Sequence, residues 1–183
     1  MLLTCKKIVK TIPIVRFELY KKEASFLIQT NLIKKVLIIL KNHFKYQFKI
    51  LTCMSGVDYP ENLYRFKVAY ELLSIKFNTR LRLKILVDEL TPINSVETIF
   101  SGAAWWESEI WDMYGVFFLG QYNLTRLLTD YGFQGYPLRK DFPLSGFTES
   151  RYNVVKSRVV YDNIEMSQEY RTFNFISPWD NLD

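Results

Sequence analysis

Two stretches of apolar–polar alternation, joined by a short polar turn, constrain the fold of this chain more than any other feature. Residues 80–87 carry leucine, isoleucine or valine at every second position, with Arg80, Arg82 and Lys84 between them. Residues 64–72 alternate in the same way. A period of two places each kind of side chain on its own face, so both stretches predict half-buried β-strands.

The connection between these strands also has a recognisable pattern. Asn78 and Thr79 predict a turn. Before that turn the apolar residues change parity, because Leu73, Ile75 and Phe77 follow Leu72. A change of phase inside one strand predicts a β-bulge.

The N-terminal third adds two strands, a helix and one more strand. Strands are predicted over Ile12–Leu19, 24–29 and 46–54, and a polar turn at 21–23 joins the first two. A helix is predicted from Thr30 or Asn31, either of which could cap it, to about Phe44. The order is therefore strand, strand, helix and three strands.

A second helical region precedes a segment without periodicity. Asn94 and Glu97 have the spacing of a capping box, and a longer helix is predicted over 103–114. Beyond Gly115 the periodicity fades, and only short strand-like pieces such as 158–161 remain. We expect a core domain over 1–115 and an irregular C-terminal arm over 116–183 that lies along a partner.

Charge is distributed unevenly between the two parts of the chain. The net charge is +5, but residues 1–50 carry eleven lysines and arginines against two acidic residues. Aromatic residues alternate with lysines over 44–49, a weak sign of nucleic-acid binding. The interpretation that we favour places the aromatics inward and the lysines outward. No apolar run approaches the ~20 residues that a transmembrane helix needs.

Few side chains are suited to metal, cluster or nucleophilic chemistry. The chain has one histidine, His43, and two cysteines, Cys5 and Cys53. These numbers argue against a zinc site, a Ser-His-Asp triad and an iron–sulfur cluster, and favour a reducing compartment. No nucleotide-binding glycine motif is present.

Residues 105–143 concentrate tryptophans, carboxylates and glycines. Glu107, Glu109 and Asp112 could serve acid–base or metal chemistry or lie on a solvated face. We favour ion pairs with basic groups across an interface, for which the nearest candidates in the chain are Arg126, Arg139 and Lys140. Trp105, Trp106 and Trp111 are interpreted as packing or interface anchors. Between Pro137 and Pro143 we expect a stiff backbone with its charges directed outward.

Three segments carry a resemblance to a known family. WWESEIWDMYGVFF, LTRLLTDYGFQGYPLRKDFPLSGF and RVVYDNIEMSQEYRTFNFISPW resemble the thirty-kilodalton subunit family of respiratory complex I, which has mitochondrial and bacterial members. The chain departs from the family pattern at Ser108, where an arginine is usual, and at Gln121, Tyr122 and Tyr136, near usual histidines.

The resemblance implies an α+β fold: a two-layer mixed β-sheet with helices on one face and an extended C-terminal arm. It implies a subunit without a catalytic site, cofactor or metal of its own, while partner subunits hold FMN and the iron–sulfur clusters. The implied partners are other complex I subunits, chiefly the forty-nine-kilodalton subunit, and not nucleic acid. The implied interface residues are Trp106, Glu107, Glu109, Trp111, Asp112, Arg126, Arg139, Lys140 and Asp141.

The implied location is the matrix side of the mitochondrial inner membrane, peripheral to the bilayer. We expect an organelle-encoded chain without a transit peptide. Two alternatives stay open: a subunit of a related plastid dehydrogenase that uses ferredoxin and plastoquinone, and a basic organellar RNA-binding protein.

Overall fold

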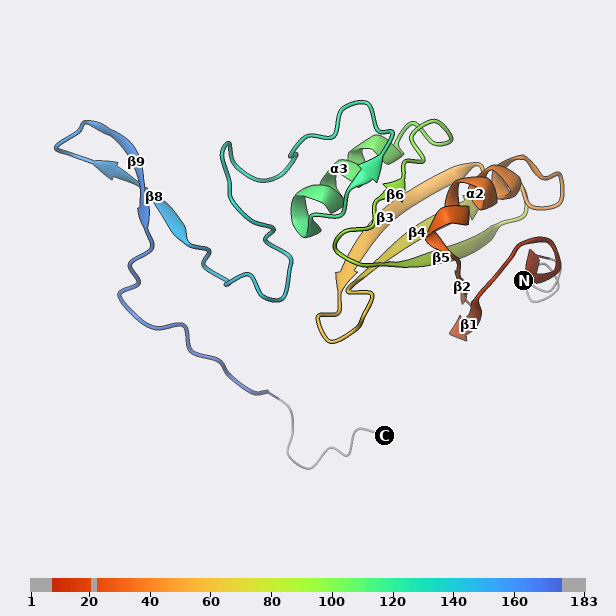
Figure 1. Cartoon of the computed structure of the whole chain (residues 1–183), viewed down its shortest axis with the longest axis horizontal. Helices are drawn as coiled ribbons and strands as arrows, with labels where there is room; N and C mark the ends of the chain where they lie inside the picture. Colours follow the sequence, from red (N-terminus) through yellow and green to blue (C-terminus); the bar gives the residue numbers. More distant parts are fainter. Residues whose placement is uncertain (1–7, 21–22, 176–183) are drawn as a thin grey trace. The chain divides into compact units, whose positions relative to one another are not determined.

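A computed structural model describes residues 8–20 and 23–175 of the chain (Figure 1). By internal contacts these residues belong to two compact units, 1–142 and 143–183. This division falls later than the expected one at residue 115, because Val116 and Phe118 are buried in the first unit.

The first unit is built on a five-stranded mixed sheet with the order β1-β2-β5-β4-β3. Its strands are β1 (Arg16–Tyr20), β2 (Glu23–Leu27), β3 (Ile50–Asp58), β4 (Phe66–Ser74) and β5 (Thr79–Val87). Strands β2 and β5 are parallel, and every other neighbouring pair is antiparallel. The expected α+β class with a mixed sheet is therefore confirmed.

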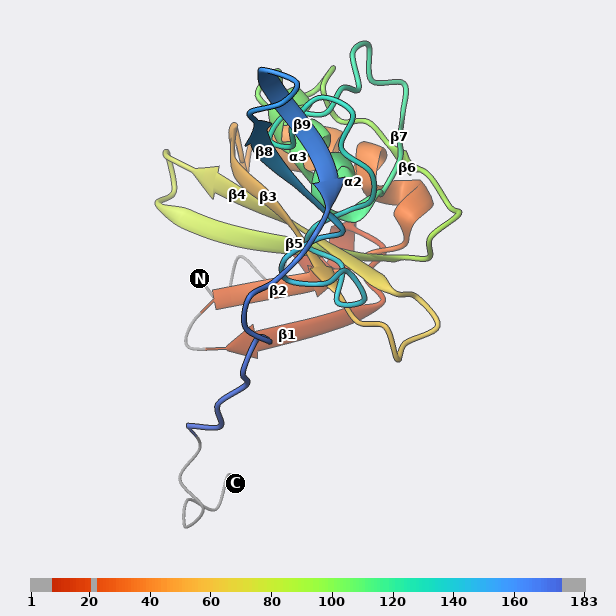
Figure 2. The same ribbon diagram turned by 90° about the vertical axis from the view of Figure 1, so that its left-hand side faces the viewer.

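The helices cover one face of this sheet (Figures 1 and 2). The helices of this layer are η1 (Thr30–Leu32), α2 (Ile33–Asn42) and α3 (Ala103–Tyr114). Alternate residues of β4 and β5 face the helices and are fully buried, as the alternation predicted; they include Val68, Tyr70, Leu83 and Ile85. The core thus lies between the sheet and a single helical layer.

The beginning of the chain differs from its prediction. Residues 8–11 are helical and β1 begins only at Arg16, so the predicted strand over Ile12–Leu19 was too long. Ile8 and Ile12 are both buried, with the i, i+4 spacing of a helical turn. The turn predicted at 21–23 falls largely on residues 21–22, which are outside the described residues.

The predicted capping residues have other partners. Neither η1 nor α2 has a side-chain cap, because the Thr30 hydroxyl donates instead to the Leu86 carbonyl at 3.1 Å. Before α3, Asn94 lies in the short strand β6 (Ile93–Asn94), and the Glu97 N–H donates to the Ser95 hydroxyl at 3.2 Å. Thr30 thus makes a contact distant in sequence instead of a cap. At the second position Ser95, the neighbour of Asn94, accepts the Glu97 N–H in its place.

The β-bulge was predicted in the wrong strand. The pairing of β4 with β5 is regular from Phe66 to Ser74, and the irregularity lies in β3 between Leu51 and Cys53. Ile75 and Phe77, which produced the change of parity, belong to the turn after β4 and are exposed. Tyr46 and Phe48 are buried as expected, but they precede β3 instead of opening it, and Phe44 is exposed.

The second unit contains one β-hairpin and no helix among its described residues. The strands β8 (Thr148–Asn153) and β9 (Arg158–Asn163) pair along their whole length. Only the β9 part was expected as strand-like sequence. No helix in the described part of the chain has the length and apolar content needed to span a bilayer.

Candidate functional site

Helix α3 and the loop that follows it hold most of the residues that the sequence singled out. The helix ends at Gly115, whose φ of +78° gives the left-handed conformation that closes many helices. Gly56 of β3 lies beneath it, and a Cβ at that position would lie 2.7 Å from the Tyr114 ring. This close contact between β3 and α3 fixes the position of the end of the helix, where the site residues lie.

Asp112 accepts more hydrogen bonds than any other carboxylate of this region. Its side chain is completely buried, and Oδ2 accepts the backbone N–H groups of residues 127–129 at 2.8–3.2 Å. Oδ1 accepts the Thr129 hydroxyl at 2.7 Å and Arg126 Nη1 at 3.1 Å. Burial alone would raise the pKa of Asp112, but these hydrogen bonds outweigh burial and hold the pKa below its ordinary value.

Arg126 links Asp112 to the loop. Its Nη1 also donates to the Gly135 carbonyl at 3.0 Å. The guanidinium lies 5.3–5.9 Å from the ring centroids of Trp111, Phe133 and Tyr136. Cation–π attraction and the ion pair together hold residues 126–136 against the end of α3.

Glu107 is also buried, but it contacts the segment that precedes α3 instead of the loop that follows it. Its two oxygens accept the Val96 N–H at 2.7 Å and the Ser95 hydroxyl at 2.8 Å. Burial raises the pKa of Glu107, and these two hydrogen bonds oppose that rise only in part. Glu107 therefore ties α3 to the chain between β6 and the helix. Glu109, in contrast, is only half-buried.

The block 137–143 donates hydrogen bonds to carbonyl groups at the C-terminal end of α3, which have no partner within the helix. The Leu138 N–H donates to the Met113 carbonyl at 3.1 Å, and Arg139 Nε donates to the Tyr114 carbonyl at 2.7 Å. A positive side chain at a helix C-terminus is also favoured by the helix dipole. Arg139 thus points inward, with only 17% of its side chain exposed, and the expectation that its charge is directed outward was wrong.

A second ion cluster fastens the same block to the sheet. Arg65 donates from Nε and Nη2 to both oxygens of buried Asp58, at 2.7 and 2.9 Å, and Asp58 also accepts the Lys140 N–H at 2.8 Å. Arg65 further pairs with Asp141 at 3.1 Å and with Glu89 at 2.5 Å. The Arg65 guanidinium holds the pKa of Asp58 below its ordinary range.

Sequence reasoning found some of these residues and missed others. Arg126 was expected as a partner for the carboxylates and does pair with Asp112. Arg139 and Lys140 use other partners, and Glu107 and Asp112 use their oxygens inside this chain. Asp58, Arg65, Ser95 and Thr129 were missed, since their contacts join positions that no local spacing relates.

The remaining candidates lie as follows. Trp106 packs against the core, Trp111 lies beside Arg126, and Trp105 is 68% exposed. Among the described residues no group of three histidine, cysteine or carboxylate side chains is arranged to hold a metal ion. Cys53 lies in β3, and Cys5 is outside the described residues.

Comparison with known families identifies the chain. The family model described as "Respiratory-chain NADH dehydrogenase, 30 Kd subunit" matches residues 26–148. The chain belongs to this family. The match includes most of the sheet, α3 and the block 137–143, so the family implied by the sequence motifs is confirmed.

Curated relatives agree over most of the chain. Subunit 9 of NADH-ubiquinone oxidoreductase from Reclinomonas americana is 51% identical over 154 residues, which are 84% of this chain and 75% of the relative. A NADH-quinone oxidoreductase subunit from the bacterium Rhodospirillum rubrum is 47% identical over 170 residues, 93% of this chain and 80% of the relative. This member of the family is therefore a subunit of an oxidoreductase complex.

A solved structure supports the fold. One chain of the membrane-bound sulfane sulfur reductase, described as an archaeal respiratory membrane complex, matches with a TM-score of 0.66 and 23% identity. The match covers 76% of this chain and 84% of that chain. At this identity the likeness concerns the fold alone.

Two departures from the family pattern lie in contact. Gln121 Nε2 donates to the Ser108 hydroxyl at 3.0 Å and to the Ala104 carbonyl at 2.9 Å. Ser108 is small and buried, so a neutral amide–hydroxyl pair joins two of the positions that the sequence analysis singled out. The two side chains are therefore in direct contact in this chain.

Proposed function

We propose that this chain is a structural subunit of the peripheral arm of proton-pumping NADH:ubiquinone oxidoreductase, respiratory complex I. It packs against the forty-nine-kilodalton subunit near the quinone-reducing module, on the matrix side of the mitochondrial inner membrane. The observation that carries the proposal is the family match over residues 26–148, supported by relatives named as subunits of NADH-ubiquinone oxidoreductase.

The internal use of the charged residues supports a scaffolding role. Asp112, Glu107 and Asp58 are buried, and each accepts hydrogen bonds that join separate segments of the first unit. A catalytic carboxylate needs an accessible position beside a substrate. These three carboxylates instead fix the backbone that presents the exposed members of the proposed interface, such as Lys140 and Asp141.

The second unit supports docking by the arm. In the β8–β9 hairpin, Tyr152 and Val159 lie opposite each other and are each 61% exposed. Arg151 and Asp162 lie on the other face and pair at 2.7 Å. An isolated two-stranded hairpin is marginally stable in water, so an amphipathic hairpin with an uncovered apolar face fits a surface completed by a partner.

The cysteine content bears on the cofactor question. Several relatives, such as that of Beta trigyna, are named "NADH dehydrogenase [ubiquinone] iron-sulfur protein 3". An iron–sulfur cluster usually takes about four thiolates, whereas this chain has two cysteines. Its residues therefore do not fit a cluster, and we propose that FMN and the clusters lie in partner subunits.

Blue-native electrophoresis with mass spectrometry of comigrating proteins tests the proposal. We expect comigration with the forty-nine-kilodalton subunit in a large membrane complex. Nuclease-sensitive comigration with ribosomes would favour an RNA-binding role, and comigration with a plastid dehydrogenase would favour that alternative.

Limited proteolysis tests the docking of the arm separately. The hairpin tip 154–157 is exposed, so we expect rapid cleavage there in the isolated chain and slow cleavage in the assembled complex. Equal cleavage rates in the two states would contradict arm docking, even if the chain comigrates with complex I.

A further inference from the structure

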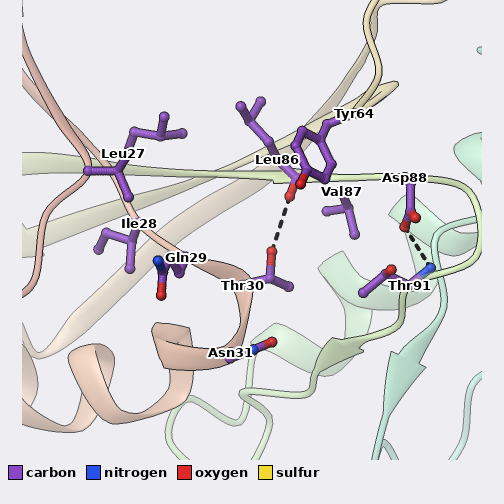
Figure 3. Close-up of a pocket in the computed structure, with 11 residues that line it drawn as sticks. Leu27, Ile28, Gln29, Thr30, Asn31, Tyr64, Leu86, Val87, Asp88 and Thr91 are labelled. Atoms are coloured by element: carbon purple, nitrogen blue, oxygen red, sulfur yellow. Dashed lines mark hydrogen bonds between the residues drawn. The ribbon is translucent and has the colours of Figure 1, made fainter.

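A cavity of about 550 Å³ opens at one end of the sheet, and Glu107, Asp112 and Arg126 are not among the residues that line it (Figure 3). Its apolar lining comes from the ends of β2 and β5 and includes Leu27, Leu86 and Val87. Tyr64 stands on one side of the opening, and Asn31 lies on the other. The volume is large enough to receive one or more side chains from another molecule.

The topology of the sheet explains why the cavity forms here. Strands β2 and β5 run parallel and separate at their carboxyl ends, since β2 leads into η1 and β5 leads into the loop at Asp88. Both walls are held in place. The Thr30 hydroxyl donates to the Leu86 carbonyl at 3.1 Å, and Asp88 Oδ1 accepts the Thr91 N–H at 2.8 Å (Figure 3).

The charge at the opening is negative. Of the described residues that line the cavity, Asp88 alone is charged. None of the ion pairs formed within residues 8–20 and 23–175 uses Asp88. Its hydrogen bonds with Thr91 hold the pKa of the carboxyl below its ordinary value, so it is ionised at neutral pH.

Large exposed apolar residues lie next in sequence to residues that line the cavity. Leu63 precedes Tyr64 and is 88% exposed, while Leu90 lies in the loop between Asp88 and Thr91 and is 92% exposed. Val15, which lines the cavity, is also exposed. Single exposed leucines are common, but here an exposed leucine lies on each of two loops that also supply a lining residue of the cavity.

We propose that this cavity is a second docking site, which receives an apolar side chain of a partner subunit from a segment that also carries a lysine or arginine. The apolar lining takes the side chain, and Asp88 pairs with the basic residue. The exposed face of Tyr64 offers the same cation a further attraction. The inference rests on the proposed place of the chain in a multi-subunit complex, but uses none of the residues of the arm.

The charge of the site argues for this occupant over other classes. A nucleic acid or an anionic lipid surface would bring phosphate groups toward the Asp88 carboxylate, where like charges repel. An acidic protein segment meets the same repulsion. A basic segment with one large apolar residue gains from both features of the cavity.

Single cysteines report whether the cavity is covered in the complex. In a chain with Cys5→Ser and Cys53→Ser, we would introduce Asn31→Cys at the cavity or Leu90→Cys next to its lining residue Thr91. Lys76→Cys, in the exposed turn between β4 and β5, is the control. In the purified complex we expect maleimide labelling at least about ten-fold slower than in the free chain at the first two sites, and unchanged at the control.

A photoreactive benzoylphenylalanine in place of Tyr64 identifies the occupant. We expect a cross-linked peptide from a co-purified subunit, with an apolar residue within a few positions of lysine or arginine. Asp88→Asn keeps an oxygen for the Thr91 N–H but removes the charge, and should lower the cross-linking yield several-fold. Glu61→Gln, on the neighbouring loop, should leave the yield unchanged.

Several results would overturn the proposal: equal labelling in the free and assembled states, cross-links only to lipid, nucleic acid or an acidic segment, or no effect of Asp88→Asn. Protection of the arm with an uncovered cavity would overturn the second site and leave the proposed function standing. Co-purification with no other protein would overturn both.

Discussion

Arg126 and Asp112 form an ion pair that joins helix α3 to the loop after it, with Nη1 and Oδ1 3.1 Å apart. Asp112 is completely buried, whereas the Arg126 side chain is 26% exposed. The Asp112 carboxylate accepts the backbone N–H groups of residues 127–129 and so fixes the conformation of this loop. The ion pair therefore holds α3 and the following loop, which both belong to the family motif, in a fixed arrangement.

Asp112→Asn should destabilise the chain by about 2–4 kcal/mol, because Arg126 loses its counter-charge at a buried site. Urea unfolding followed by circular dichroism gives the free energy. Glu109→Gln, on the same helix but half-buried, should change it by less than about 0.5 kcal/mol. Equal effects of the two substitutions would show that the Asp112 contacts contribute little.

Gly56→Ala should destabilise the first unit by about 1–3 kcal/mol, because its Cβ would lie 2.7 Å from two atoms of the Tyr114 ring. The control is Gly102→Ala, where no atom lies within 4 Å of the added Cβ and φ is −66°. That change should be neutral or slightly stabilising. Thermal unfolding of both variants measures the difference, and an unaffected Gly56→Ala variant would contradict the close packing.

Asp58 should make the stability of the chain depend on acidic pH. Its pKa is lowered in the folded state, mainly by Arg65, so its contribution is present above the ordinary value of 3.8. That contribution is lost as the pH falls through the lower, folded pKa. We expect Asp58→Asn to be less stable than the wild type at pH 7, and the difference to shrink as the pH falls progressively below 3.8. A difference that is constant with pH in urea titrations would refute this.

Glu107 should make the stability of the chain depend on pH in the opposite direction. Its pKa is raised in the folded state, so its stabilising contribution is full below the ordinary value of 4.5 and is lost as the pH rises through the folded pKa. Glu107→Gln can still accept the Val96 N–H and donate to Ser95. The stability of this variant relative to the wild type should therefore improve as the pH rises above 4.5. Glu107→Ala, which leaves the Val96 N–H unpaired, should be destabilised throughout.

Arg139→Ala should lower the amount of assembled complex while sparing electron transfer in whatever assembles. The substitution removes the hydrogen bond to the Tyr114 carbonyl and the contacts with the Tyr136 and Phe66 rings. Lys76→Ala, in the exposed turn between β4 and β5 and outside the proposed interface, is the control. Normal assembly with lost quinone reduction would instead place Arg139 in the reaction.

Elements with a strong local pattern were predictable from the sequence. The alternation over 80–87 identified the buried face of β5, and helix α3 begins and ends where expected. The beginning of β1 and the bulge were not found. Ile12 is apolar in either a strand or a helical turn, and the parity of Ile75 and Phe77 reflects exposed turn residues, so apolar pattern alone does not separate these cases.

The site was predictable only in outline. The motif identified the family, and the expected partnership of Arg126 with a carboxylate is present. The Asp58 contact with the Lys140 N–H joins positions 82 residues apart, and no local spacing indicates it. Arg139 turns inward because the carbonyl end of α3 needs donors, a demand that arises only once the helix has been placed.

The strand order β1-β2-β5-β4-β3 also has a consequence for how the chain folds. Strands β3, β4 and β5 follow one another along the chain and pair through short connections, so they can assemble early at a small entropic cost. The parallel pairing of Ser25 with Arg82 must wait for a much longer loop to close. We therefore expect the β3–β5 meander to gain hydrogen-exchange protection first during refolding, and the N-terminal hairpin to dock last.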